Sequence, residues 1–120
     1  MMYVNFMASW VINLTPHDVV VRRPDCGELR IPVHGSAIRL AESRAPVAGD
    51  GLQRVTLSFP DGIPEPVTSP DGKPVFYIVS SLVAQAAALA GRRDFIAPDT
   101  NRAERDANGR ILSVPGFVCF

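Results

Sequence analysis

Apolar and polar residues along the chain are arranged in short runs that predict several strands. Residues 10–14 and the stretch that follows Pro16 are rich in β-branched side chains, which is typical of two strands separated by a tight connection. Residues 24–27 contain Pro, Asp and Gly and predict a turn. Residues 19–23 and 28–32 are therefore expected to pair as a hairpin.

The middle of the chain predicts less regular structure. Residues 36–40 are expected to form a short strand, and residues 42–52, with Ala, Pro and two Gly, a surface loop. Residues 53–59 alternate between apolar and polar side chains, which predicts a strand with one buried and one exposed face. Residues 60–74 hold five prolines and two Asp-Gly turns, so this stretch is expected to be irregular.

One strand and one helix are predicted most clearly. The continuous apolar run over residues 75–79 is typical of a central strand that is covered on both faces. Ser80 or Ser81 is then expected to cap a helix over residues 82–90, which Gly91 ends. Because this helix is apolar almost all round, we expect it to be buried within the domain or in an oligomer.

The end of the chain predicts a second hairpin and completes the fold class. Asn108-Gly109 is a strong hairpin turn signal, and residues 111–114 and 117–120 read as late strands. The order of elements predicts an α+β fold, a small mixed or antiparallel sheet with one main helix packed on it. The expected core includes Ile12, Leu14, Val19, Val21, Leu57, Phe76, Ile78, Leu82, Val83, Ala86 and Ile111.

Length and composition set the domain organisation. A chain of 120 residues is expected to form one domain, here residues 11–120, after a flexible extension over residues 1–10. Either Met1 or Met7 could be the start. No apolar run approaches the roughly 20 residues that span a bilayer, and the first residues lack the basic region of a signal peptide. A cytoplasmic protein without membrane attachment is expected.

Charge and cysteine content narrow the function classes. The formal net charge is zero, so a nucleic-acid partner is disfavoured and any anion site must be local. The two cysteines, Cys26 and Cys119, and the two histidines are far apart in the sequence, so they do not have the close spacing of metal ligands. We expect reduced thiols, no metal and no cofactor.

Two polar segments between apolar stretches are the candidate site. Residues 92–110 hold five of the eleven arginines and four acidic residues, and residues 13–18 form a second polar segment near the start. Arginine recognises phosphate or carboxylate with a planar pair of donors, although such a loop could also be solvated and paired with itself. The candidate ligand-binding residues are Asn13, Thr15, His17, Ser80, Ser81, Arg92, Arg93, Asn101, Arg102, Arg105 and Asp106.

The two polar segments are expected to meet near the first turn of the helix, where backbone N–H groups and the helix dipole favour an anion. Catalysis is the alternative use of the same residues. A histidine changes its charge close to neutral pH, so His17 could be an acid/base, assisted by Asp99 or Asp106. No nucleophile elbow, phosphate-binding loop or zinc-protease motif is present.

Four segments together resemble a family of small bacteriophage and prophage proteins that lack an established activity. The segments are residues 12–19, 62–66, 77–86 and 105–111, and the family opens with Asn-Leu-Thr-Pro-His and closes with an Arg-Asp-x-x-Gly-Arg-Ile hairpin. The resemblance covers most of residues 11–117. It implies a phage accessory protein of the host-cell cytoplasm, of the kind that counters host defence.

Three functions follow as hypotheses. The first is a non-enzymatic protein that binds and sequesters a small anionic, phosphorylated nucleotide-like ligand. The second is an enzyme that cleaves a nucleotide-derived signal with His17 as acid/base. The third is an interaction module that inhibits a host protein or serves the virion. The apolar helix and the apolar tail over residues 114–120 also predict a homo-oligomer.

Overall fold

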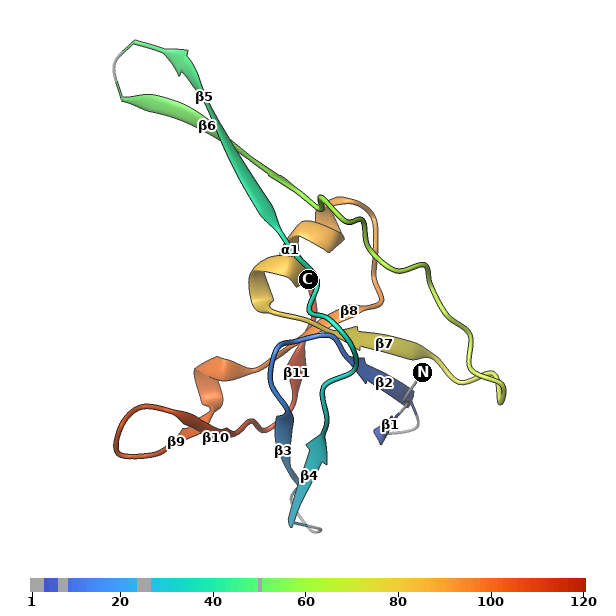
Figure 1. The fold of residues 1–120 in the computed structure, drawn as a ribbon. Coiled ribbons are helices and arrows are strands. Elements are labelled where there is room, and N and C mark those ends of the chain that lie inside the picture. The colour runs from blue at the N-terminus through green and yellow to red at the C-terminus, as the bar shows by residue number, and fades with distance from the viewer. Residues whose placement is uncertain (1–3, 7–8, 24–26, 50) are drawn as a thin grey trace.

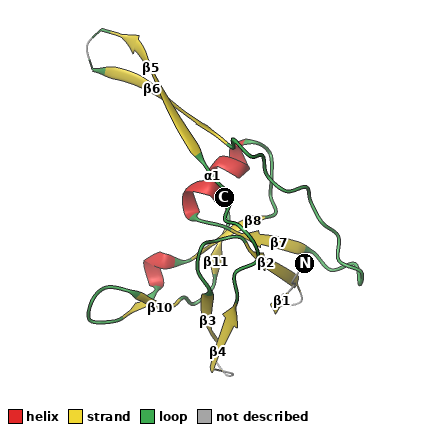
Figure 2. Ribbon diagram, viewed as in Figure 1, coloured by secondary structure: helices red, strands yellow, loops and turns green. Residues whose placement is uncertain are grey.

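A mixed five-stranded sheet forms the centre of the protein (Figures 1 and 2). The computed structural model describes residues 4–6, 9–23, 27–49 and 51–120. Three neighbouring strands run parallel in the order β2 (Ser9–Asn13), β7 (Val75–Ile78) and β8 (Phe95–Pro98). Antiparallel strands complete the two edges, β1 (Val4–Phe6) beside β2 and β11 (Phe117–Val118) beside β8.

Three antiparallel strand pairs extend from this sheet. They are β3 (Val19–Arg23) with β4 (Gly27–Ile31), β5 (Ala41–Ala48) with β6 (Leu52–Ser58), and β9 (Glu104–Arg105) with β10 (Ile111–Ser113). The first and third confirm the two predicted hairpins; the turn residues 24–26 lie outside the described residues. A short 3-10 helix, η1 (Thr100–Arg102), precedes β9.

The helix α1 (Ser81–Leu89) confirms the predicted start and stop signals. Ser80 is the N-cap, and its Oγ accepts a hydrogen bond from the backbone N–H of Val83 at 3.3 Å. The chain leaves the helix at Ala90, and Gly91 follows with a φ of 88°, a conformation that glycine adopts without strain. The helix connects β7 to β8, which is the connection that parallel neighbours require.

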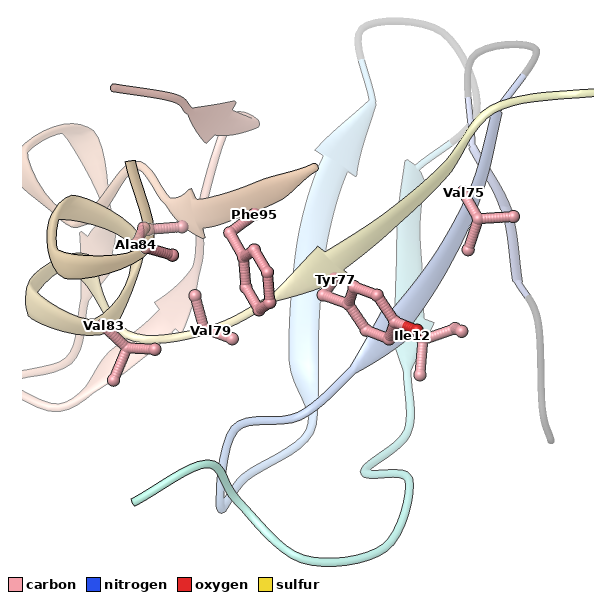
Figure 3. Close-up of a cluster of buried hydrophobic side chains, with 9 residues drawn as sticks. Ile12, Val75, Tyr77, Val79, Val83, Ala84 and Phe95 are labelled. Carbon is pink, nitrogen blue, oxygen red and sulfur yellow. The ribbon is translucent and has the colours of Figure 1, made fainter. Parts of the chain in front are cut away.

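Two apolar clusters cover the two faces of the sheet because β7 alternates between them. On one face Val75, Tyr77 and Val79 pack with α1, and Tyr77 stacks on Phe95 with ring centroids 5.3 Å apart (Figure 3). On the other face Ile78 packs with the β3–β4 hairpin and Val114. The predicted central strand at residues 75–79 is thereby confirmed as β7 and the residue after it.

The predicted core is correct for the residues of the two apolar clusters and wrong for three residues that are exposed. Ile12, Val19, Val21, Ile78 and Val83 are buried, whereas Leu14 and Phe76 are partly buried against the core clusters and Ala86 is half-buried. Leu57, Leu82 and Ile111 are 37%, 54% and 45% exposed. These three belong to the β5–β6 pair, the outer side of α1 and the β9–β10 hairpin, which do not lie between the sheet and its cover.

Three local predictions are corrected. Residues 36–40 contain no strand, and the described part of residues 42–52 is not one loop, because residues 42–48 belong to β5 and Leu52 begins β6. Residues 53–59 do form a strand, β6, yet it is exposed on both faces. The described part of the predicted extension also belongs to the sheet, since Val4–Phe6 pairs with β2 and Trp10 pairs with Val75.

The fold is therefore mixed α and β, with strands dominating, as α+β broadly predicts. Of the two predicted sheet types, mixed and antiparallel, the central sheet is the mixed one, with three parallel strands between antiparallel edges. As predicted, residues 60–74 are irregular; apart from one isolated bridge they contain no strand or helix.

Asp71 holds this irregular connection against β2. Its carboxylate accepts hydrogen bonds from Ser69 Oγ, from Trp10 Nε1 at 3.0 Å and from the backbone N–H of Lys73 at 3.2 Å. The Ser69 bond, with those from Trp10 and Lys73, lowers the pKa of Asp71 to about 2. The Lys73 ammonium also lies 5.8 Å from the centre of the Trp10 ring.

Asp71 makes stability depend on acid pH. Because the pKa is lower in the folded state than the ordinary 3.8, the stabilisation is complete above about pH 4 and is lost as the pH falls toward 2. We expect Asp71→Asn to reduce the fall in melting temperature between pH 5 and pH 2, measured by circular dichroism. Asp61→Asn, in the same connection, is the matched control, and an equal effect of both substitutions would contradict this role.

The two sides of α1 are expected to respond differently to a charge. Val83 is buried, so Val83→Asp should lower the free energy of unfolding by more than about 3 kcal/mol. Leu82 is exposed in the first turn, where a carboxylate is favoured by the helix dipole, so Leu82→Asp should change it by less than about 1 kcal/mol. Urea titration measures both values, and a large loss in Leu82→Asp would contradict the assigned orientation.

Candidate functional site

The parallel strands bring three polar segments to one edge of the sheet. β2, β7 and β8 all end at this edge, and they are followed by residues 14–18, by Ser80 and Ser81, and by residues 99–102. The edge at the carboxyl ends of parallel strands is where α/β proteins commonly bind ligands. The segments far apart in sequence therefore meet beside the start of α1.

A hollow of about 990 Å³ lies at this edge. Its apolar walls include Val19, Val79, Ile111, Leu112 and Val114. Its polar lining comes from four separate parts of the chain and consists of Thr15, His17, Asp18, Arg30, Ser80, Ser81, Thr100, Arg105 and Arg110. The combination of an apolar wall with a few converging polar groups is typical of small-molecule sites.

Asn13 shapes the segment that carries His17. This residue is fully buried, and its Nδ2 donates to the carbonyl oxygens of His17 at 2.9 Å and Ile31 at 3.0 Å. Its Oδ1 accepts from the backbone N–H of Thr15 at 2.9 Å and from the Thr15 hydroxyl at 2.6 Å. The predicted ligand-binding role of Asn13 is thus replaced by a structural one, because its amide is fully used within the protein.

Three arginines make the hollow locally basic. Arg30 lies 3.5 Å from the Asp18 carboxylate, the acidic group in the lining, and Arg105 Nη1 donates to the carbonyl of Gly109 at 2.8 Å. The guanidinium of Arg110 makes no ion pair with any residue that the structure describes. Three positive charges thus face one carboxylate, which favours an anionic occupant.

The start of α1 adds two serine hydroxyl groups to the lining of the hollow. The Ser80 hydroxyl caps the helix, and the Ser81 hydroxyl accepts from Gln85 Nε2 at 3.1 Å. Ser80 and Ser81 are both exposed and line the hollow, as the sequence predicted. The positive end of the helix dipole acts here in the same direction as the arginines.

Two predicted arginines are used elsewhere. Arg92 forms a bidentate pair with Asp94, at 2.7 and 2.9 Å, and stacks on the Phe95 ring at 4.9 Å. The hydrogen bonds that Arg92 donates to the Asp94 carboxylate raise the pKa of Arg92. Arg93 Nη1 donates to the carbonyl of Phe120 at 3.1 Å. Neither side chain lines the hollow.

The remaining predicted residues fall outside the hollow as well. Arg102 lies 3.6 Å from Asp99, and the two line a separate hollow of about 430 Å³. Asn101 is exposed in η1 and lines neither hollow. Asp106 accepts from the backbone N–H groups of Asn108 and Arg110, both at 2.9 Å, which closes the hairpin turn. The structure therefore brings His17 together with neither Asp99 nor Asp106.

Four lining residues were missed in the sequence, namely Asp18, Arg30, Thr100 and Arg110. In the observed hairpin Arg30 pairs with Val20, two positions after Asp18, and the predicted bounds of the hairpin did not give this register. Arg110 directly follows the predicted Asn-Gly turn and lines the hollow together with Arg105. Only the parallel arrangement of β7 and β8 brings Thr100 to the same place.

Other classes of site find no support in the described residues. Within residues 4–6, 9–23, 27–49 and 51–120, no three His, Cys, Asp or Glu side chains are grouped to hold a metal ion. The helices of the same residues are all too short or too polar to cross a membrane. Comparison of the chain with protein-family models, curated proteins and solved structures found no match.

Replacing Asn13 should destabilise the protein, because its amide is hydrogen-bonded within the fold. Asn13→Ala leaves the Ile31 carbonyl and the Thr15 N–H without their partner, which should cost about 1–3 kcal/mol of unfolding free energy. Asn101→Ala, an exposed residue outside both hollows, is the control and should change nothing measurable. Chemical denaturation compares them, and equal stability of both variants would show that Asn13 is not structural.

Proposed function

We propose that this chain binds a small anionic, nucleotide-like ligand in the hollow at the carboxyl ends of β2, β7 and β8. The observation that supports this most directly is the convergence of Arg30, Arg105 and Arg110 on an apolar-walled hollow beside the start of α1. Its volume lies near the upper end of the roughly 300–1,000 Å³ of ligand pockets, which suits a ligand larger than a single phosphate.

The lining suits two chemically different parts of such a ligand. Arg105, at the end of β9, and Arg110, just before β10, are suited to phosphate oxygens, which guanidinium groups bind bidentately. Val19, Ile111 and Leu112 supply the apolar wall against which a base or sugar ring can pack. Ser80, Ser81 and Thr15 add hydroxyl groups for a polar edge.

Binding without turnover is the function that the geometry favours. In the described part of the chain no side chain hydrogen-bonds the His17 ring, and the neighbouring Asp18 carboxylate accepts from the backbone N–H of Val33 at 3.0 Å. An acid/base histidine is ordinarily oriented by a partner group. His17 is better suited to contact the ligand than to move a proton.

The biological role that we propose for this binding is sequestration of the ligand. Three of the four segments that carry the phage-type resemblance, residues 12–19, 77–86 and 105–111, contribute residues to the lining of the hollow. A protein that removes a nucleotide-derived host signal in the cytoplasm needs affinity and a rigid site, and no reaction. This setting is part of the proposal.

The arginines of the β9–β10 hairpin should carry the affinity. A charge-assisted hydrogen bond contributes roughly 1.5–3 kcal/mol, so Arg105→Ala and Arg110→Ala should each weaken binding by about ten- to a hundredfold. Isothermal titration with mononucleotides, dinucleotides and cyclic dinucleotides measures this effect. Arg93→Ala, outside the hollow, is the matched control, and equal affinity of all three variants would contradict the proposed site.

His17→Ala separates binding from catalysis. It should lower affinity without changing the fate of the nucleotide, because the ring contacts the ligand only. Mass spectrometry of the nucleotide after incubation with wild-type protein and release by denaturation should recover it intact. Recovery of a cleaved product that is absent with His17→Ala would instead establish an enzyme.

A further inference from the structure

The β5–β6 hairpin projects from the body of the protein as an arm (Figure 1). From Glu42 to Ala48 and from Leu52 to Ser58 every described residue is exposed. Neither strand pairs with any further strand among the residues that the structure describes. The protein consequently measures 56 Å along its longest axis and only 22 Å along its shortest.

The arm carries more exposed apolar side chains than a connection that contacts only solvent would need. Its exposed side chains include Val47, Leu52, Val55 and Leu57, and these are 46%, 57%, 47% and 37% exposed. A two-stranded hairpin that packs on nothing is only marginally stable in water. A strand edge with apolar side chains is ordinarily covered by another chain or blocked by charge or proline.

The two edges of the arm differ in their capacity to pair. β5 contains Pro46, which has no N–H to donate, and its register shifts between Pro46 and Ala48. β6 reads Leu-Gln-Arg-Val-Thr-Leu-Ser and contains no proline, glycine or acidic residue. The β5 edge is therefore interrupted, whereas β6 presents seven regular residues, about 24 Å of strand, for a further partner.

We propose that β6 pairs antiparallel with β6 of a second copy of this chain, about a twofold axis at Val55. In this register Val55 lies opposite itself, Arg54 lies opposite Thr56, and Gln53 lies opposite Leu57. The single charge of the strand never faces its own copy, and valine at the axis is a favourable cross-strand pair. This register sets no two charges directly opposite each other and has the twofold symmetry of an interface between identical chains.

This pairing converts two marginal hairpins into one four-stranded sheet. The outward N–H and C=O groups of both β6 strands are satisfied, and β5, with its proline, becomes the outer edge on each side. The surface differs from the helix face and the tail, which the sequence marked for oligomerisation. It is also independent of the ligand proposal, because no residue of the arm lines the hollow.

Opposite charges at Thr56 test this register. Thr56→Lys sets two Lys–Arg54 pairs across the axis and should weaken dimer association by about 3- to 30-fold, whereas Thr56→Glu sets two ion pairs and should strengthen it. Within one arm Thr56 lies opposite Ser43, so neither variant places two charges directly opposite each other there. Arg54, on the same face of the same strand, is a neighbour of position 56 in the monomer and the dimer alike. Sedimentation equilibrium of the full chain from 1 to about 500 µM measures association.

Ser43→Lys and Ser43→Glu are the matched controls, since Ser43 is on the same face but on the outer strand. They should change association less than the Thr56 variants do.

Val55→Cys should also form a disulfide-linked dimer under mild oxidation, whereas Val47→Cys, equally exposed but on β5, should not. A wild-type monomer at every concentration, or a dimer that the two Thr56 variants shift equally or not at all, would overturn the proposal.

Discussion

The parallel pairing of β7 between β2 and β8 is the interaction on which the rest of this structure depends. Backbone hydrogen bonds such as those from the Leu14 N–H to the Ile78 carbonyl and from the Val79 N–H to the Ile96 carbonyl continue it past the strand ends. Because all three strands point the same way, the polar segments that follow them meet at one edge. The apolar side chains of β7 supply both core clusters, so the hollow rests on the most buried part of the protein.

Polar residues near the hollow divide into those that build it and those that can act in it. The side-chain oxygens of Asn13 and Asp106 accept hydrogen bonds from backbone N–H groups. Arg105 and Arg110 belong to the hairpin that Asp106 closes, and both line the hollow. The division follows burial: Asn13 is enclosed and fully bonded, whereas the arginines are exposed. A rigid frame that holds exposed cationic groups suits a binding protein, because little side-chain and loop ordering is then needed on binding.

The sequence predicted the elements whose signals are local. An apolar run, a serine cap and a following glycine mark β7 and α1 in the sequence, and the Asn-Gly turn marks the last hairpin. The arm was missed because a strand exposed on both faces has no alternation toward a core, and Pro46 argued against a strand. Leu82 was misplaced because an apolar helix does not reveal which side faces the sheet.

The sequence also predicted part of the candidate site, where polar residues directly follow a predicted strand. Thr15, His17, Ser80, Ser81 and Arg105 were found from polar segments beside apolar strands, and the structure brings all five to one hollow. Arg92, Arg93 and Arg102 were included through their position in a charged segment, although each has a nearer partner in the fold. Position in the sequence could not distinguish Arg105 from these three arginines, because the direction of the strands decides which arginine reaches the hollow.

The central claim, that the carboxyl edge of the three parallel strands is a binding site, is tested most directly by nuclear magnetic resonance. Amide spectra of the ¹⁵N-labelled protein would be recorded while cyclic dinucleotides and nucleoside diphosphates are added in turn. The account predicts that one of these compounds shifts signals of residues 15–19, 80–81, 100 and 105–112 and leaves the arm unchanged. Shifts confined to the hollow of Asp99 and Arg102, or no shifts with any of the compounds at millimolar concentration, would contradict it.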